Sequence, residues 1–169
     1  HVNRLSVKAA IREKIEKGRY FTLNAARQTG KTTLFREVIA ELEAEGKYFG
    51  VVLDFGSLKG FKGARWYERL GVELQAQARR LKVAETAPVI RDHGDFIDWL
   101  KDRVREREQP GVLIIDEFDA TPDDIMVNLL SLLRAMYLAR DQPHYPALHS
   151  LILVGVRNIP ALLGGTQSP

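Results

Sequence analysis

The 169-residue chain has the length of one folded domain; 45% of its residues are apolar and 28% are charged. These proportions are ordinary for a globular protein, and no apolar run is long enough to cross a bilayer. The chain has no cysteine, which excludes disulfides, zinc–thiolate sites and thiol nucleophiles, and predicts a cytoplasmic location. The formal net charge of +3 suits an anionic ligand but is too small to predict nucleic-acid binding by itself.

Apolar periodicity and end signals predict helices and strands that alternate along the first half of the chain. Ser6 is a favourable N-cap for a first helix, which Gly18 would end. The predicted elements are a helix at 6–17, a strand at 20–25, a helix from 31 to Gly46, a strand at 48–53 and a helix at 66–81. Residues 56–63 and 83–94 are predicted loops.

The second half continues the alternation. The predicted elements are a helix at 95–107, a strand at 112–115, a helix that ends near 140 and a strand at 150–156. Thr121 is expected to cap the last of these helices, with Pro122 at its first position. The mixed charges at 101–108 favour a solvated helix face over a nucleic-acid patch. No strand is predicted after Val156, because residues 159–169 contain two prolines and two adjacent glycines.

The strands are largely solid apolar runs, which is typical of strands buried on both faces. Such strands alternating with helices predict an α/β fold, in which a parallel sheet is covered by helices on both sides. Ligands of these sheets bind at the carboxyl ends of the strands. Three chemically suggestive sites fall just past predicted strand ends, at residues 25–32, 116–117 and 157–158.

The first of these sites fits the phosphate-binding loop pattern G-x-x-x-x-G-K-[ST], except that Ala25 stands at the first glycine position. Backbone N–H groups of such a loop and the positive end of the following helix form an anion site. Gly30 lets the backbone approach phosphate oxygens. Lys31 supplies a positive charge for the β- and γ-phosphates, and the Thr32 hydroxyl can ligate Mg²⁺.

The second site is Asp116-Glu117, which follows four apolar residues. An aspartate that leaves a buried strand beside a phosphate loop can hold the magnesium shell, and the next residue can orient or deprotonate an attacking water. The alternative is an acidic turn with no chemical role. Asp119 is expected to serve the turn rather than the metal.

The third site is the pair Arg157 and Asn158, just after the predicted strand at 150–156. Either side chain is placed to touch a γ-phosphate or the attacking water, and the sequence register does not choose between them. An ordinary polar loop is the alternative interpretation.

Four motifs together resemble a bacterial family of AAA-like ATPases, within the additional-strand, catalytic-Glu branch of P-loop NTPases. They are RYFT at 19–22, ARQTGKTT at 26–33, IIDEFD at 114–119 and VGVRN at 154–158. The resemblance implies that ATP is bound by Ala25, Ala26, Arg27, Gln28, Thr29, Gly30, Lys31, Thr32 and Thr33. It implies Mg²⁺ at Thr32 and Asp116, water activation by Glu117, and a γ-phosphate sensor at Arg157 or Asn158.

The resemblance also implies features near the two ends of the chain. The segment at 2–5, with Arg4 as a candidate, would pack near the adenine. Relatives carry a fifth strand and a helical lid, so we expect a domain over residues 1–169 that is incomplete at its C-terminus. The first residue, His1, likewise suggests a fragment.

The predicted function is a Mg²⁺-dependent ATPase that couples its nucleotide state to a partner protein or an attached output domain. The alternative is a nucleotide-binding switch with little hydrolysis, which could dispense with Glu117. A small-molecule kinase is disfavoured, since no acceptor site or arginine-rich lid is recognisable. DNA processing is conceivable by the resemblance, but no basic surface with interleaved aromatics supports it.

Overall fold

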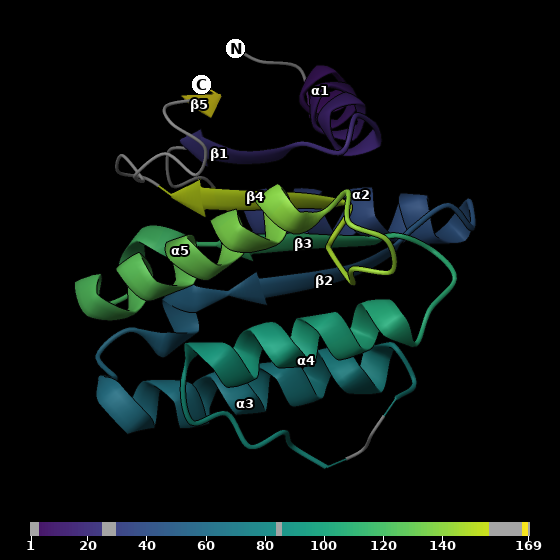
Figure 1. Cartoon of the computed structure of the whole chain (residues 1–169). Coiled ribbons are helices and arrows are strands. Elements are labelled where there is room, and N and C mark those ends of the chain that lie inside the picture. The colour runs from purple at the N-terminus through teal and green to yellow at the C-terminus, as the bar shows by residue number, and fades with distance from the viewer. Residues whose placement is uncertain (1–3, 25–29, 84–85, 156–166, 169) are drawn as a thin grey trace.

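The computed structural model describes residues 4–24, 30–83, 86–155 and 167–168. Helices and strands alternate as the sequence predicts (Figure 1). The elements are α1 (Arg4–Glu16), β1 (Tyr20–Asn24), α2 (Lys31–Ala44), β2 (Phe49–Asp54), η1 (Phe55–Leu58), α3 (Gly63–Arg80), α4 (His93–Arg105), β3 (Gly111–Asp116), η2 (Phe118–Ala120), α5 (Asp123–Ala139), β4 (Ser150–Gly155) and β5 (Gln167–Ser168). The η elements are short 3₁₀ turns. None of the described helices is both long and apolar enough to span a bilayer.

The five strands form one sheet in the order β2-β3-β4-β1-β5. Every pair in it is parallel, so all strands end at the same edge (Figure 1). The α/β class predicted from the sequence is therefore confirmed. The order also places β4 between the strand that leads to the loop, β1, and the strand that ends in Asp116, β3.

The expectation that no strand follows Val156 was wrong. Gln167 and Ser168 pair with Thr22 and Leu23 and add β5 outside β1. The pairing uses only backbone groups of two non-proline residues, so the prolines and glycines of the surrounding sequence did not exclude it. As a result, β1 has a neighbouring strand on each side, β4 along Tyr20–Asn24 and β5 at Thr22 and Leu23.

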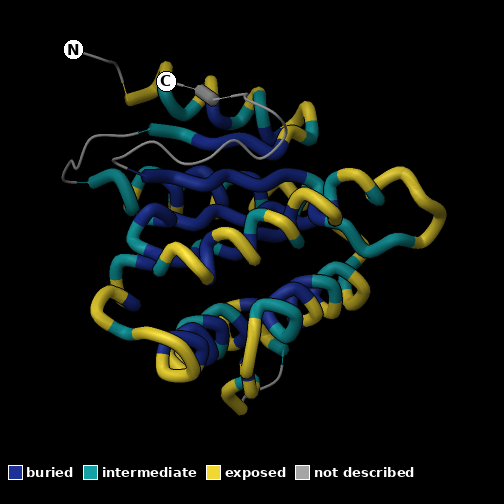
Figure 2. Tube along the Cα trace, turned by 60° about the vertical axis from the view of Figure 1, so that its left-hand side comes forward, coloured by how far each residue is buried: buried dark blue, intermediate teal, exposed yellow. Residues whose placement is uncertain are grey.

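Both faces of the sheet are buried, while the outer sides of the helices are exposed (Figure 2). Along β1, β2, β3 and β4, side chains alternate between two apolar clusters. Ile114 and Ile152 face α1 and α2, whereas Leu113 and Leu153 face the side of α3, α4 and α5. This double burial explains why the strands are solid apolar runs.

The free edge of β2 is covered by side chains. Glu43 accepts a hydrogen bond from the Gly50 N–H (3.1 Å), and Gln77 accepts one from the Val52 N–H (3.1 Å). The Arg80 guanidinium donates to the Gly50 carbonyl. These contacts satisfy backbone groups that an exposed edge would otherwise offer to another strand.

Two predicted helix caps were wrong, while two predicted glycine stops are confirmed. Ser6 lies inside α1, since the helix already includes Arg4, which is held by an ion pair to Glu37. The Thr121 hydroxyl donates to the Phe118 carbonyl (2.6 Å) instead of capping α5, so Pro122 takes the N-cap position. The stops Gly18 and Gly46 have φ values of 68° and 71°, which favour glycine.

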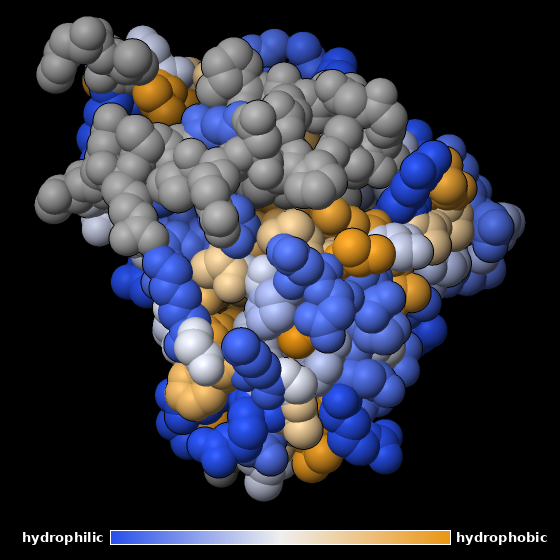
Figure 3. Space-filling view, turned by 90° about the vertical axis from the view of Figure 1, so that its left-hand side faces the viewer, coloured by the Kyte–Doolittle hydropathy of each residue, from blue (hydrophilic) through white to orange (hydrophobic). Residues whose placement is uncertain are grey.

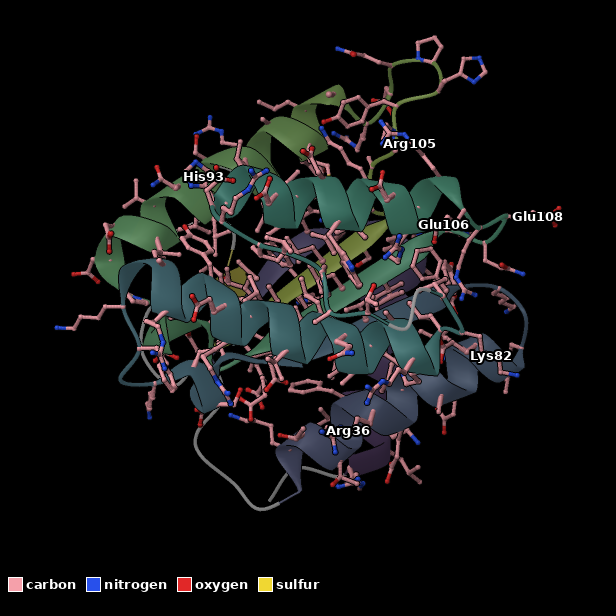
Figure 4. All side chains as sticks on the ribbon, turned by 90° about the horizontal axis from the view of Figure 1, so that it is seen from below. Arg36, Lys82, His93, Arg105, Glu106 and Glu108 are labelled. Atoms are coloured by element: carbon pink, nitrogen blue, oxygen red, sulfur yellow. The ribbon has the colours of Figure 1, made fainter. Side chains whose placement is uncertain are left out.

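The charged run at 101–108 is a solvated helix face only in part. Arg103 is 8% exposed, packs over the Trp99 ring and pairs with Glu106 (2.7 Å). By contrast, the side chains of Arg105 and Glu108 extend away from the body of the molecule (Figure 4). The sequence pattern did not predict the burial of Arg103. An arginine can pack its apolar stem against other side chains while its charged group pairs at the surface, so its charge alone does not show whether it is exposed.

Replacing Trp66 by alanine should destabilise the fold by about 3–5 kcal/mol. Trp66 is fully buried on α3, and its ring packs edge-on against Phe55 just after β2. Val72→Ala on the same helix is the control, because Val72 is 47% exposed and should change stability by less than about 0.5 kcal/mol. Urea unfolding followed by circular dichroism measures both, and equal effects would contradict the assignment of Trp66 to the core.

Candidate functional site

The junction between β1 and α2 has the backbone that a phosphate loop requires at its end. Gly30 adopts φ 91°, a left-handed conformation that favours glycine, and α2 begins at Lys31. No described side chain caps the N-terminus of α2, and its first turn contains no acidic residue. Its first N–H groups and helix dipole are therefore available to an anion. The predicted loop residues Ala25–Thr29 lie outside the described residues.

Asp116 joins the two predicted motifs. It ends β3 and is 2% exposed. Its Oδ1 lies 3.1 Å from Lys31 Nζ, and its Oδ2 accepts a hydrogen bond from the Thr32 hydroxyl at 3.0 Å. Residues that are 84 positions apart in the chain thus form one polar cluster at the carboxyl edge of the sheet. Figure 3 faces this edge, where the described surface is mostly hydrophilic.

Lys31 is arranged to accept a further partner. Its side chain is 11% exposed, and the ion pair with Asp116 is not aligned as a hydrogen bond. The buried Nζ has no hydrogen-bond acceptor among the residues that the structure describes. Because an ammonium group carries three N–H donors, a phosphate oxygen would satisfy a need that the described protein atoms leave open.

Thr32 and Asp116 fit a magnesium ion that takes two ligands from the protein, rather than a metal that is bound by protein side chains alone. Their two oxygens lie 3.0 Å apart, about the spacing of neighbouring ligands around Mg²⁺ at its usual ligand distance of about 2.1 Å. Within the described ranges, no three His, Cys, Asp or Glu residues are grouped so as to hold a metal. Mg²⁺ commonly takes one or two protein ligands and completes its shell with water and phosphate.

Glu117 projects differently from Asp116 because its backbone turns sharply. Its φ of 51° and ψ of 40° are left-handed, which is uncommon for a residue other than glycine. Its N–H donates to Asp116 Oδ1 at 2.8 Å, which ties the turn to the polar cluster. The Glu117 carboxylate lies against Gly56, the second residue of η1. The sequence predicted the Asp–Glu pair but missed Gly56, whose only signal was a glycine two residues after the end of a strand.

For three other predicted residues, Asp119, Arg157 and Asn158, the structure gives less information. Asp119 lies in η2 and is 8% exposed. Arg157 and Asn158 lie outside the described residues. Their strand, β4, pairs with β1 and β3, as the predicted sensor position requires. Their roles stay predictions.

Arg4 lies beside the start of α2. Its Nη2 is 2.9 Å from Glu37 Oε1, and its Nη1 lies 3.6 Å from the point that a Cβ would occupy at Gly30. It is the first of three basic residues on α1 that pair with acids on α2. The closest pairs are Arg4–Glu37, Lys8–Glu41 and Arg12–Glu45. The predicted contact of Arg4 with adenine is not tested by these distances.

Solved structures similar to this chain include ORC and Cdc6 proteins. Drosophila ORC bound to poly(dA/dT) DNA and Cdc6 matches with a TM-score of 0.60 and 13% identity, over 92% of this chain and 25% of that chain. Cdc6p from Pyrobaculum aerophilum matches with 0.60 and 17%, over 92% and 39%. The Aeropyrum pernix ORC2 protein, solved as ADPNP-ADP complexes, matches with 0.51 and 15%, over 90% and 39%.

These likenesses support the fold alone, because the identities are low, and this chain spans between 25% and 39% of the three relatives' lengths. No curated protein matches the sequence. A sequence model of the AAA domain family, however, matches residues 15–163, a range that runs from the end of α1 past the end of β4. The match includes the predicted loop, and also Lys31 and the acidic pair Asp116-Glu117, whose geometry is described above. The chain belongs to the AAA domain family.

Proposed function

We propose that the chain binds ATP with Mg²⁺ and hydrolyses it to ADP and phosphate. The observation that carries the proposal is the cluster in which Asp116 holds both Lys31, at 3.1 Å, and Thr32, at 3.0 Å, beside the open N-terminus of α2. Membership of the AAA domain family supports nucleotide binding. The similar Aeropyrum pernix ORC2 protein, solved as ADPNP-ADP complexes, supports an adenine nucleotide.

In this proposal the phosphates lie over the start of α2. The loop at 25–33 donates backbone N–H groups to them, and Gly30 lets the chain approach closely. Lys31 turns from Asp116 towards the β- and γ-phosphates. Thr32 and Asp116 supply oxygen ligands for Mg²⁺, which when bound neutralises phosphate charge.

Glu117 is the proposed base for the attacking water. It follows the metal-binding aspartate directly, and its left-handed backbone sends its side chain in another direction. Arg157 or Asn158, after β4, is the proposed γ-phosphate sensor. The loop residues and the sensor lie outside the described part of the chain, so these assignments rest on the sequence and on the neighbouring strands.

We further propose that residues 1–169 act as one nucleotide-binding domain in the cytoplasm, whose nucleotide state is coupled to a partner protein or an output domain. A switch with little hydrolysis is the alternative, and an intact Glu117 favours turnover. The structure of Drosophila ORC contains DNA. Here three basic side chains of α1, Arg4, Lys8 and Arg12, pair with acidic residues on α2 or at its C-cap, which does not favour this face of α1 as a DNA-binding surface.

Lys31→Ala should weaken ATP·Mg binding by tenfold or more, because charge-assisted hydrogen bonds contribute about 1.5–3 kcal/mol. Asp116 keeps its hydrogen bonds to Thr32 and to the Glu117 N–H, so the fold should survive. Calorimetric titration measures the affinity. Lys47→Ala removes an exposed lysine just past the other end of α2 and should leave affinity unchanged. Equal affinities of the Lys31 variant and the wild type would contradict the phosphate-loop assignment.

Glu117→Gln should keep ATP·Mg binding and lower turnover by roughly a hundredfold, because an amide fills the same space but cannot take a proton. Phosphate release is measured with the protein in excess over ATP, so that a slow single turnover can still be seen. Glu108→Gln is the matched control, since Glu108 is exposed and points into solvent (Figure 4). An unchanged rate in the Glu117 variant would remove this residue from the base role.

A further inference from the structure

We propose that Gly56 is a positioning residue: its missing side chain leaves the space in which the Glu117 carboxylate lies. This inference rests on the proposed role of Glu117 as the base. It adds a second segment, the turn after β2, to the residues that the reaction would depend on.

The contact is direct. A Cβ built on Gly56 would overlap Glu117 Oε2, far inside van der Waals contact, and would lie 2.8 Å from Glu117 Cδ and 2.9 Å from Asp54 Oδ1. Real Cβ atoms essentially never lie that close to other atoms. Any residue larger than glycine at this position therefore requires the Glu117 carboxylate to move.

The turn that carries Gly56 is firmly held. Asp54 accepts a hydrogen bond from the Gly56 N–H at 2.8 Å, and the Ser57 hydroxyl lies 2.8 Å from the Asp54 carbonyl oxygen. The Phe55 ring stacks on Phe118, with centroids 5.9 Å apart. Because Asp54 and Asp116 are register partners at the ends of β2 and β3, the turns that follow, η1 and η2, lie together. Gly56 cannot easily withdraw from Glu117.

The same geometry predicts that replacing Gly56 by alanine displaces the Glu117 carboxylate but has little effect on the stability of the fold. Gly56 is not among the glycines with positive φ, so its backbone conformation is open to alanine. The three nearest atoms that a Cβ would meet are side-chain atoms of Glu117 and Asp54, and the atoms that it overlaps most belong to the Glu117 carboxylate, which can move without a shift of the backbone. The cost in stability is therefore small, while the proposed base is displaced. Misplacing a reacting group by about 1 Å can slow a reaction on the order of a hundredfold.

Gly56→Ala tests the inference in the full chain. We expect single-turnover ATP hydrolysis to fall at least about tenfold, and the dissociation constant of ATP·Mg to stay within about twofold of the wild-type value. The matched control is Gly71→Ala on α3, whose Cβ would lie 2.8 Å from the Pro88 carbonyl oxygen. In that variant the new methyl group meets backbone atoms, so the melting temperature of the protein should fall. At temperatures where the variant is still folded, its rate of ATP hydrolysis should equal that of the wild type.

A double-variant cycle separates positioning from general damage. If Gly56 acts only through Glu117, adding Gly56→Ala to Glu117→Gln should slow the reaction no further. A normal rate in Gly56→Ala, or a full further loss in the double variant, would overturn the inference. If Glu117→Gln alone hydrolyses ATP normally, the proposed base fails instead, so the two failures can be told apart.

Discussion

The candidate site depends on one buried carboxylate. Asp116 is 2% exposed, and burial of an ionised group is costly unless it is paired and hydrogen-bonded. Its partners are the Lys31 ammonium, the Thr32 hydroxyl and the Glu117 N–H. The first two start α2 and the third starts the turn after β3. Because Lys31 is ion-paired with Asp116, a phosphate that binds Lys31 would have to compete with that ion pair.

The sheet makes this contact possible. β3 and β1 are not neighbours, because β4 lies between them, but all three end at the same edge. α2 follows β1 and packs over β2 and β3 on one face, which brings its first turn to the end of β3. The pairing of β5 with β1 at Thr22 and Leu23 gives the strand that leads into the loop a neighbour on each side.

The turn after β3, rather than the strand itself, sets the direction of the Glu117 side chain. Glu117 has a left-handed backbone, and the ring stack between Phe55 and Phe118 holds the turns after β2 and β3 against each other. Trp66 packs edge-on against Phe55 and thereby connects this pair to α3. A defect in the α3 core can therefore reach the site through aromatic packing, with no contact to a ligand.

The sequence by itself determined the α/β class, the positions of the first four strands, and the pairing of a lysine–threonine turn with an Asp–Glu strand end. These features depend on local patterns: solid apolar runs, glycine at helix ends, and polar residues just after strands. Only the tertiary structure decided that Ser168 joins the sheet, that Arg103 is buried and that Gly56 leaves room for Glu117. Each of these depends on what lies opposite a residue in space, which chain order does not specify.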